Sequence, residues 1–360
     1  LYIIFTLGIC SQFITYGLYR GYMNMIGANI VQLLGTAIIP IVVFMNVKNI
    51  YEGLLWIGSI ILIIMVFAFI IRNKGLKILE VTFSKIKKII RFGLERIPSF
   101  ISQFVLLAGI PIYLAQTVNF ESVAYFNSSL SLVRLSLIIV SPIGMVLLPR
   151  ISNKIASGAN EDLPNILRII FKAGIVFSVI VTVFCYINAP FILEFWLGEV
   201  SKTGITILRI AILALPCYTF SGLARSPIDA VSERGYNSLI YGLAAVSMII
   251  FILVGKNYNL DLLKTALFSF LFSHIIAGLG SVFFLQRLYN FSFIDFKLIR
   301  DIVAITFIMI TISQIISYTY LSILSQFILT SVIYIVIGIV IFNFVKTGWI
   351  AELKEKIYAK

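Results

Sequence analysis

Arginines inside strongly apolar stretches are the residues of this sequence best suited to chemistry. Arg134 lies near the middle of a stretch that we expect to cross a membrane at 122–147, and Arg209 lies in another at 204–224. An arginine at bilayer depth is energetically costly unless it faces water or a partner. Neither arginine has a carboxylate one helical turn away in the sequence. We therefore expect both to bind an anionic substrate in a hydrated space, with snorkelling or an ion pair to another helix as the alternative.

Polar residues recur at helical spacing on three of the predicted helices, so each of these helices carries a polar stripe. The stripes are Asn127, Ser131, Arg134 and Ser141; Arg96, Ser99 and Gln103; and Asn29, Gln32 and Thr36. Because polar side chains are penalised where they face lipid, we expect the stripes to line one water-filled space and to bind substrate there. The alternative is that the serines and amides only hold neighbouring helices together.

Two titratable residues are candidates for proton or ion coupling. His274 is the only histidine and lies inside the predicted span 262–285, where a hydrogen-bonded packing role is the alternative to a proton relay. Glu95 directly precedes Arg96 at the beginning of the predicted span 93–116. Arg96 at this position is either a substrate-binding cation or an interfacial anchor.

The sequence has no constellation typical of an enzyme or of a bound cofactor. Cys10, Cys185 and Cys217 are isolated in apolar stretches, without the spacing of metal ligands. The sequence also lacks a phosphate-binding glycine loop, a Ser/His/Asp set and a long connecting segment that would house an active site. We therefore expect no enzymatic activity, no cofactor and no metal.

The composition places these residues in a membrane. Hydrophobic residues make up 60% of the chain and charged residues 12%, against about a quarter charged in soluble proteins, and the mean hydropathy is +1.06. Continuous apolar stretches predict eleven spanning helices and an all-α integral membrane fold. The predicted spans are 2–19, 25–46, 51–71, 93–116, 122–147, 166–187, 204–224, 237–255, 262–285, 301–320 and 323–345. Leu1 already lies in an apolar stretch, so we expect the chain to be N-terminally incomplete.

Lysines and arginines are concentrated in alternate connecting segments. One set of segments holds 21 of them, and the other holds four, Lys48, Lys202, Lys256 and Lys264. The positive-inside rule makes the first set cytoplasmic and places the C-terminus on the cytoplasmic side. The net charge of +13 therefore reflects topology and contact with membrane lipids, and we expect no nucleic-acid partner.

The polar breaks between the spans predict the domain organisation. We expect residues 1–71 to be three helices of a six-helix N-terminal bundle and 93–286 to be a C-terminal six-helix bundle. The basic segment 72–92 between them has apolar residues at helical spacing, which favours an amphipathic cytoplasmic connector on anionic lipid. An extra helix pair at 287–345 and a cytoplasmic tail at 346–360 complete the chain. The tripeptide Arg-Gly-Tyr occurs at 20–22 and 234–236, at matching positions of two bundles, as in transporter repeats.

Several segments resemble one family. The stretch at 92–152 is similar to the seventh and eighth helices of bacterial polysaccharide flippases of the MOP superfamily, with GLERIPSF at 93–100 and LLPRIS at 147–152. FWLGEVSKTGITILRIAILALP at 195–216 and DAVSERGYNS at 229–238 resemble its later connections. The sequence departs from the family pattern at Glu95 and Arg96, where small apolar residues are usual.

The resemblance implies a two-bundle, MATE-like transporter fold in a bacterial inner membrane. It also implies a flippase that moves undecaprenyl-diphosphate-linked oligosaccharide from the cytoplasmic to the outer leaflet by alternating access, for O-antigen (lipopolysaccharide), capsule or exopolysaccharide biosynthesis. A glycan polymerase and a chain-length regulator are the protein partners that it implies. In this interpretation Arg134, helped by Arg96 and Arg209, pairs with the diphosphate, while the serines and amides take the sugar hydroxyls.

Three other functions compete with this interpretation. A MATE-type multidrug or cation antiporter would need an Asp or Glu in the middle of a span, which the predicted spans lack, although the N-terminal helices that we expect to be missing could hold one. A lipid II flippase would bind the same diphosphate group. A membrane-bound glycan polymerase or acyltransferase would need a catalytic constellation, and the short outer connections are poor in His, Asp and Glu.

Overall fold

The computed structural model describes residues 1–22, 24–72, 82–157, 163–198, 201–232, 234–290, 292, 296–318 and 324–340. Within these ranges, the side chains of residues 85, 136–146, 148–150, 156 and 297 lie outside the description. The described elements are helices, with no strand among them. The predicted tail at 346–360 lies outside the described residues.

Nine helices of the described chain are long and apolar enough to cross a membrane. They are Tyr2–Gly21, Met25–Asn46, Ile50–Arg72, Ile86–Thr117, Leu163–Ile187, Lys202–Val231, Tyr236–Asn257, Leu262–Tyr289 and Leu298–Ser317. The predicted span at 122–147 lies within one helix of 37 residues, and the described part of the last predicted span is the shorter apolar helix Leu324–Val340. The prediction of an all-helical, multi-pass membrane protein is therefore confirmed.

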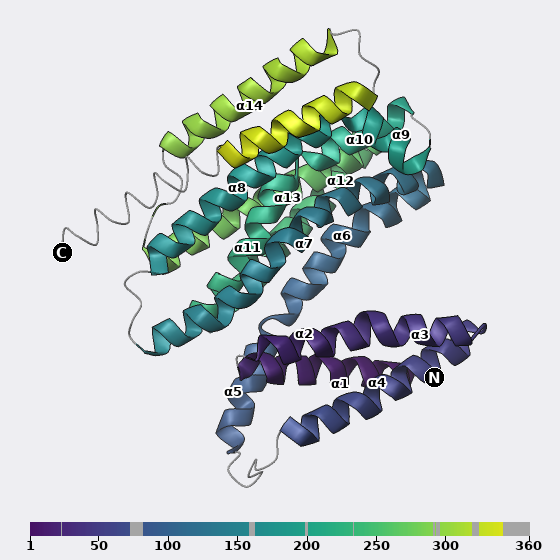
Figure 1. Ribbon diagram of the computed structural model, residues 1–360, viewed down its shortest axis with the longest axis vertical. Helices are drawn as coiled ribbons and strands as arrows, with labels where there is room; N and C mark the ends of the chain where they lie inside the picture. The colour runs from purple at the N-terminus through teal and green to yellow at the C-terminus, as the bar shows by residue number, and fades with distance from the viewer. Residues whose placement is uncertain are drawn as a thin grey trace, which may run out of the picture. The chain divides into compact units, whose positions relative to one another are not determined.

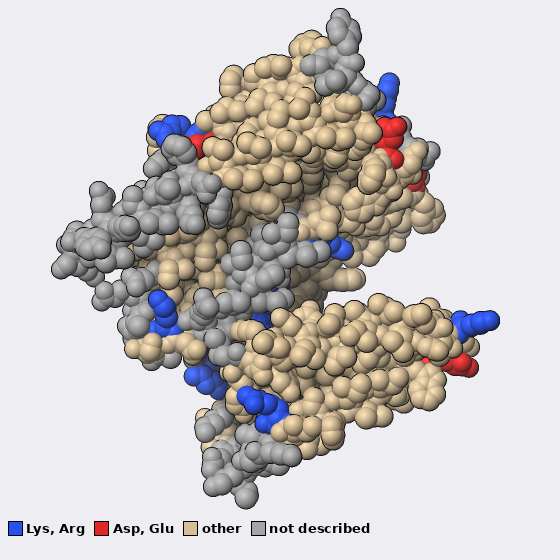
Figure 2. Space-filling model, in the orientation of Figure 1, with Lys and Arg blue, Asp and Glu red and all other residues tan. Residues whose placement is uncertain are grey.

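The helices present large apolar side chains on their outer faces. Ile63, Phe104 and Phe307, for example, are 69%, 64% and 70% exposed. Most of the surface visible in Figure 2 carries no charge, and lysines, arginines and acidic residues gather mainly near helix ends. Exposed apolar surface on this scale fits contact with lipid rather than with water.

The contacts divide the chain into two compact units, Leu1–Lys87 and Lys88–Lys360, each with a core of its own. The division falls within α5 (Phe83–Leu94), which belongs to the predicted connector 72–92. Residues 73–81 of that connector lie outside the described residues. The described side chains of α5 are almost all exposed, apolar and basic alike.

The first unit consists of α1 (Tyr2–Gly21), α2 (Met25–Leu33), η1 (Leu34–Ile38), α3 (Ile39–Asn46) and α4 (Ile50–Arg72). The predicted span at 25–46 is continuous, but the structure inserts one π-helical turn, η1, before Pro40. Proline has no amide hydrogen to donate to the preceding turn, and the wider turn accommodates that gap. Val31, Ile61 and Met65 are part of the core of this unit.

Two glycines bring α1 and α4 into backbone contact. A Cβ atom added to Gly8 would lie 2.4 Å from the carbonyl oxygen of Gly58, and one added to Gly58 would lie 2.5 Å from the Cα atom of Phe5. Further along the same contact, the Thr15 hydroxyl donates to the Met65 carbonyl oxygen at 3.2 Å. Small residues that let helix backbones approach are a recurrent device of membrane helices, which have no hydrophobic effect to hold them together.

The second unit has a core formed by α6 (Ile97–Thr117), α7 (Phe120–Ala156), α8 (Leu163–Ile187), α9 (Ala189–Leu197), α10 (Lys202–Ile212), α11 (Leu215–Val231), α12 (Tyr236–Asn257) and α13 (Leu262–Tyr289). The predicted span at 204–224 lies within Lys202–Val231, but the structure interrupts the α-helix there at Leu213 and Ala214. The reason is Pro216 in the first turn of α11, which cannot donate to the preceding turn.

The last two helices pack on the outer side of α8 in the second unit. Figure 1 shows α14 (Phe296–Ser317) and the helix Leu324–Val340 lying along this side, and their buried residues form a small separate cluster with Val183 of α8. The Tyr334 hydroxyl donates to the Met309 carbonyl oxygen at 2.8 Å, which ties the two helices together.

The close approach of α1 and α4 leads to the first prediction. Replacing Gly8 with Ala adds a methyl group where the backbone of Gly58 already lies, so the two helices must separate. We expect the free energy of unfolding to fall by about 1–3 kcal/mol, the usual cost of overpacking. The matched control is Gly17→Ala on the same helix, because no atom lies within 4 Å of a Cβ there.

Thermal unfolding of the purified variants in detergent measures the difference. An unchanged unfolding temperature for Gly8→Ala, relative to Gly17→Ala, would contradict the backbone contact between these helices.

Candidate functional site

The polar stripe of α7 is exposed on the surface of the second unit. The Asn119 side chain caps this helix by accepting a hydrogen bond from the amide of Ser122 at 2.8 Å. Asn127, Ser131 and Arg134 are all exposed, although the buried side of the same helix contributes to the core. The Ser131 hydroxyl donates to the Asn127 carbonyl oxygen at 2.9 Å, within the helix. The side chain of Ser141, also predicted for this stripe, lies outside the described residues.

Arg134 carries a positive charge that no acidic side chain of the described chain compensates. Across the described ranges it has neither an ion pair nor a hydrogen bond, and its electrostatic neighbour is Tyr218 of α11. A guanidinium group has five N–H donors and no acceptor, so the part of the chain that the structure describes leaves this group unsatisfied. In a helix that is predicted to cross a membrane, such a group needs water or an anion.

A second stripe runs along α11. Tyr218, Gly222, Arg225 and Asp229 recur at intervals of three or four residues and are all half-buried. We call these four residues the α11 stripe; its polar side chains are those of the tyrosine, the arginine and the aspartate. Tyr218 is near Arg134 of α7, whereas Arg225 and Asp229 contact α6. The stripe therefore lies where α11 is flanked by α6 and α7.

Arg225 is held in place by neutral groups. Its Nη1 donates to the Oε1 atom of Gln103 at 2.9 Å, and its guanidinium carbon lies 4.5 Å from the centre of the Phe100 ring. The Asn237 side chain donates to the Arg225 carbonyl oxygen at 3.0 Å. Stacking on an aromatic face and one amide contact fix the direction of the guanidinium without neutralising it.

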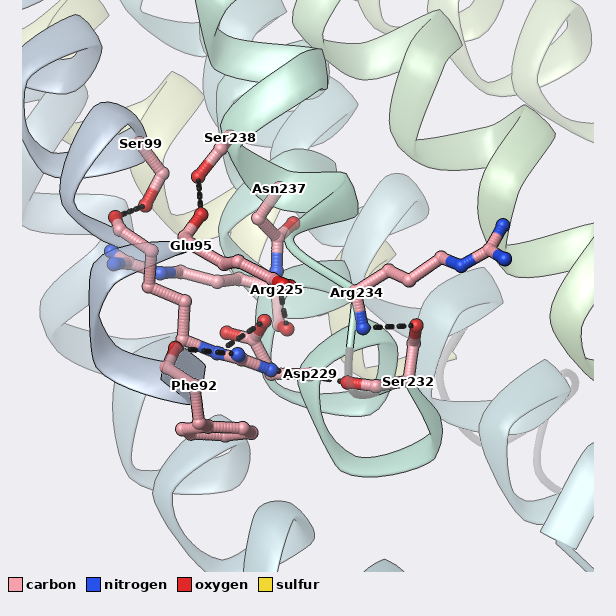
Figure 3. A network of polar contacts seen from close by, with 10 residues as sticks. Phe92, Glu95, Ser99, Arg225, Asp229, Ser232, Arg234, Asn237 and Ser238 are labelled. Atoms are coloured by element: carbon pink, nitrogen blue, oxygen red, sulfur yellow. Dashed lines mark hydrogen bonds and ion pairs between the residues drawn. The ribbon is translucent and has the colours of Figure 1, made fainter. Parts of the chain in front are cut away.

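Arg96 has an ion-pair partner and two carbonyl acceptors within the second unit. Its Nε lies 3.2 Å from the Oδ1 atom of Asp229, and its other nitrogens donate to the carbonyl oxygens of Phe92 at 2.9 Å and Ser232 at 3.1 Å. The guanidinium also lies 3.3 Å from the centre of the Phe92 ring. Figure 3 shows Asp229 and Ser232 converging with Phe92 in this network. Arg96 is 8% exposed and the Asp229 side chain is 17% exposed, so the ion pair is mostly buried.

Backbone groups also make contacts in the same region. The Ser238 hydroxyl donates to the Glu95 carbonyl oxygen, as Figure 3 shows, and a Cβ atom on Gly235 would lie 2.3 Å from that oxygen. The junction of α5 and α6 therefore lies directly against the turn between α11 and α12. We call this region, built around Arg96, Asp229 and Gly235, the α6–α11 corner.

Two predicted residues of this region make contacts within their own segment. The Glu95 carboxylate pairs with Arg91 one turn earlier, at 3.1 Å, and the Arg91 side chain is 81% exposed. The Ser99 hydroxyl donates to the Arg96 carbonyl oxygen at 2.8 Å and is buried. Gln103 is the third polar residue of α6 and is half-buried against Arg225.

Arg209 and His274 also have partners within the second unit. The Nε of Arg209 donates to the Tyr186 carbonyl oxygen near the end of α8, at 3.1 Å, and the guanidinium carbon lies 5.2 Å from the centre of the Tyr186 ring. His274 is buried, with Nδ1 2.9 Å from the Phe270 carbonyl oxygen and aromatic rings on either side. These contacts favour a packing role for His274.

Asn29 and Gln32 belong to the first unit. Both are exposed on α2, and the Thr36 hydroxyl donates to the Gln32 carbonyl oxygen at 2.7 Å. The stripe that they form is therefore polar and uncovered within its own unit.

Arg225 and Asp229 were not among the sequence-predicted site residues. Arg225 was assigned to a cytoplasmic segment beyond the end of the predicted span at 224, but α11 continues to Val231. The available signal was the recurrence of Tyr218, Arg225 and Asp229 at seven and four residues, which places them on one face of a helix. The predicted span was ended at 224 by its hydropathy, so it left out Arg225 and Asp229.

The buried ion pair of the α6–α11 corner leads to the second prediction. Replacing Arg96 with Ala leaves the Asp229 carboxylate without its partner, and removing one member of a buried pair costs about 3–5 kcal/mol of unfolding free energy. We expect Asp229→Ala to cost a similar amount. The double variant should cost less than the sum, because the two residues interact directly.

The exposed pair of Arg91 and Glu95 provides the matched control. Exposed ion pairs contribute about 0–1 kcal/mol, so Arg91→Ala should barely change the unfolding temperature in detergent. Additive losses for Arg96→Ala and Asp229→Ala would show that the pair does not stabilise the corner.

We compared the chain with models of protein families, with curated proteins and with solved structures. None of the three comparisons finds a match. Function is therefore inferred from the residues and their geometry.

Proposed function

We propose that the protein is a flippase of a MATE-like fold that moves undecaprenyl-diphosphate-linked oligosaccharide from the cytoplasmic to the outer leaflet of a bacterial inner membrane, for surface-glycan assembly. The observation that carries this proposal is Arg134, an exposed cation without an ion pair among the described residues, on a long helix of a multi-pass membrane protein. The sequence resemblance to polysaccharide flippases supports the same function.

The charge of Arg134 favours an anionic ligand. A guanidinium facing hydrocarbon would be strongly penalised, so the exposed face of α7 must be hydrated where Arg134 lies. Arginine binds phosphate groups through two parallel N–H···O bonds, which gives geometric fit as well as energy. The diphosphate of a lipid-linked glycan supplies such oxygens, and its polyprenyl tail stays in the surrounding lipid.

Neighbouring polar groups suit the sugar part of the cargo. Asn127 and Ser131 are exposed on the same stripe as Arg134, and the Asn127 amide offers both a donor and an acceptor. Asn29 and Gln32 offer the same chemistry in the first unit. Arg96 is left out of the binding set, because its charge is paired with the Asp229 carboxylate. Arg209 has a carbonyl oxygen and an aromatic ring as partners but no carboxylate among the described residues, so its charge stays available to the cargo.

The membrane potential favours outward movement of a negative cargo. Each uncompensated charge that crosses an inside-negative membrane contributes about 2.3 kcal/mol per 100 mV. A flippase that works by alternating access can use this energy without hydrolysing a nucleotide.

An antiporter of the MATE type is the main alternative, and Asp229 is the observation that bears on it. A carboxylate in a membrane helix is typical of ion-coupled exporters. Here the carboxylate is paired with Arg96, which removes its net charge, whereas Arg134 has no ion pair in the described ranges. A lipid II flippase shares the diphosphate chemistry and differs in the sugar.

The third prediction concerns Arg134. In the organism that carries the gene, we expect Arg134→Ala to abolish most of the surface glycan and to cause lipid-linked oligosaccharide to accumulate in the inner leaflet. Arg134→Lys keeps the charge but loses the bidentate geometry, so it should retain partial function. Glycan is measured by gel or antibody staining of cells, with protein level checked by immunoblot.

Arg300→Ala is the matched control, since Arg300 is an exposed arginine of α14 paired with the adjacent Asp301. It should leave the glycan unchanged. Normal surface glycan in cells that express Arg134→Ala at the normal level would refute the proposed role of Arg134. Resistance to cationic drugs that depends on the gene, without any change in glycan, would favour the antiporter.

A further inference from the structure

The α6–α11 corner and the residues next to it contain more positive than negative charge. Arg96 at the beginning of α6 pairs with Asp229 of α11, and Arg225 of α11 contacts Gln103 of α6. Arg96 uses the Asp229 carboxylate, whereas Arg225 donates to a neutral amide. Glu95 is paired with Arg91. One positive charge at Arg225 is therefore left without a carboxylate among the described residues.

The guanidinium of Arg225 is positioned in advance of any ligand. Phe100 covers one face of it, Gln103 accepts from Nη1, and the Arg225 backbone is held by Asn237. Four of its five N–H donors have no acceptor within the described chain. A half-buried cation that is held rigidly and not neutralised is costly unless an anion or ordered water occupies the space next to it.

Arg134 and Arg225 lie at different positions along the α11 stripe. Arg134 is near Tyr218, and Arg225 lies about two turns further along α11, roughly 10 Å along the helix axis. The end of α11 nearer Arg225 is the end that the distribution of lysines and arginines makes cytoplasmic. A ligand that moves outward along the α11 stripe would therefore meet Arg225 before Arg134.

We propose that Arg225, held by Gln103 and Phe100, is a second anion-binding residue that receives the phosphate groups of a polyprenyl-diphosphate cargo at the cytoplasmic end of the α11 stripe. This inference rests on the proposed function for the identity of the cargo. Arg225 binds the phosphate oxygens first, and the cargo then passes along the rest of the α11 stripe to Arg134.

Binding measurements on the purified protein in nanodiscs test the proposal. The probe is farnesyl-diphosphate-linked N-acetylglucosamine, and inorganic pyrophosphate and vesicles of phosphatidylglycerol are the competitors. We expect Arg225→Gln to weaken binding by about tenfold to a hundredfold, the loss typical of a charged hydrogen-bonding group. Arg234→Gln should bind normally, because Arg234 is exposed and points away from Asp229 in Figure 3.

Gln103→Glu provides a variant that keeps the fold. Glutamate has nearly the shape of glutamine, and its carboxylate would pair with Arg225 across the existing 2.9 Å contact. We expect this variant to unfold at the same or a higher temperature than the wild type, and yet to lose binding by about tenfold or more. Loss of binding without loss of stability separates neutralisation of Arg225 from misfolding.

Wild-type affinity for the probe in both Arg225→Gln and Gln103→Glu would overturn the proposal, and so would a wild-type protein that does not bind the probe. Competition by pyrophosphate at matching affinity would support the anion site but identify free phosphate as its ligand. Competition by phosphatidylglycerol alone would identify a lipid headgroup and overturn the assignment to cargo. Deleting the gene tests the proposed function separately, because an unchanged surface glycan refutes the flippase while probe binding at Arg225 can persist.

Discussion

The cost of placing a guanidinium group in a membrane protein is the constraint on which this structure depends. Each arginine in or near a helix of the second unit must find an acid, a carbonyl oxygen, an aromatic face or water. Arg96 pairs with Asp229 and donates to two carbonyl oxygens, and Arg209 donates to a carbonyl oxygen near the end of α8. Arg225 donates to a neutral amide and lies against an aromatic ring. Arg134 has no hydrogen-bond acceptor in the described chain. Of these four arginines, Arg209, Arg225 and Arg134 therefore carry a charge that no acidic side chain of the described chain compensates.

The ion-paired Arg96 fixes the surroundings of Arg225. The network around Arg96 and the backbone contact of Gly235 with Glu95 join the beginning of α6 to the turn that follows α11. Because this corner is buried and tied at several points, the relative position of α6 and α11 is set there. Gln103 and Phe100 of α6 then meet Arg225 of α11 at a defined geometry. The ion pair of Arg96 with Asp229 thus helps to fix the position of Arg225, whose charge is available to bind an anion.

Most of the helices were predictable from the sequence, and most of the site was not. Long apolar stretches allow no structure other than helices in a bilayer, so hydropathy located them well. Hydropathy does not predict the break before Pro216 or the π-helical turn before Pro40, since both are local changes of the backbone within apolar sequence. The exposure of Arg134 on α7 followed from the helical spacing of its polar neighbours. The partners of Arg96 and Arg225 lie more than a hundred residues away, beyond the reach of any local pattern.

The central claim is that the polar face of α7 is in contact with water. Labelling of a single cysteine with a membrane-impermeant maleimide in intact membranes tests it, because a thiol reacts only where it is hydrated. Cys10, Cys185 and Cys217 are first replaced, and cysteine is then introduced in Arg134→Cys and, as a lipid-facing control, in Phe272→Cys on the exposed apolar face of α13. We predict rapid labelling at position 134 and little at position 272. Equal protection of both positions would contradict a hydrated face and remove the physical basis for anion binding at Arg134.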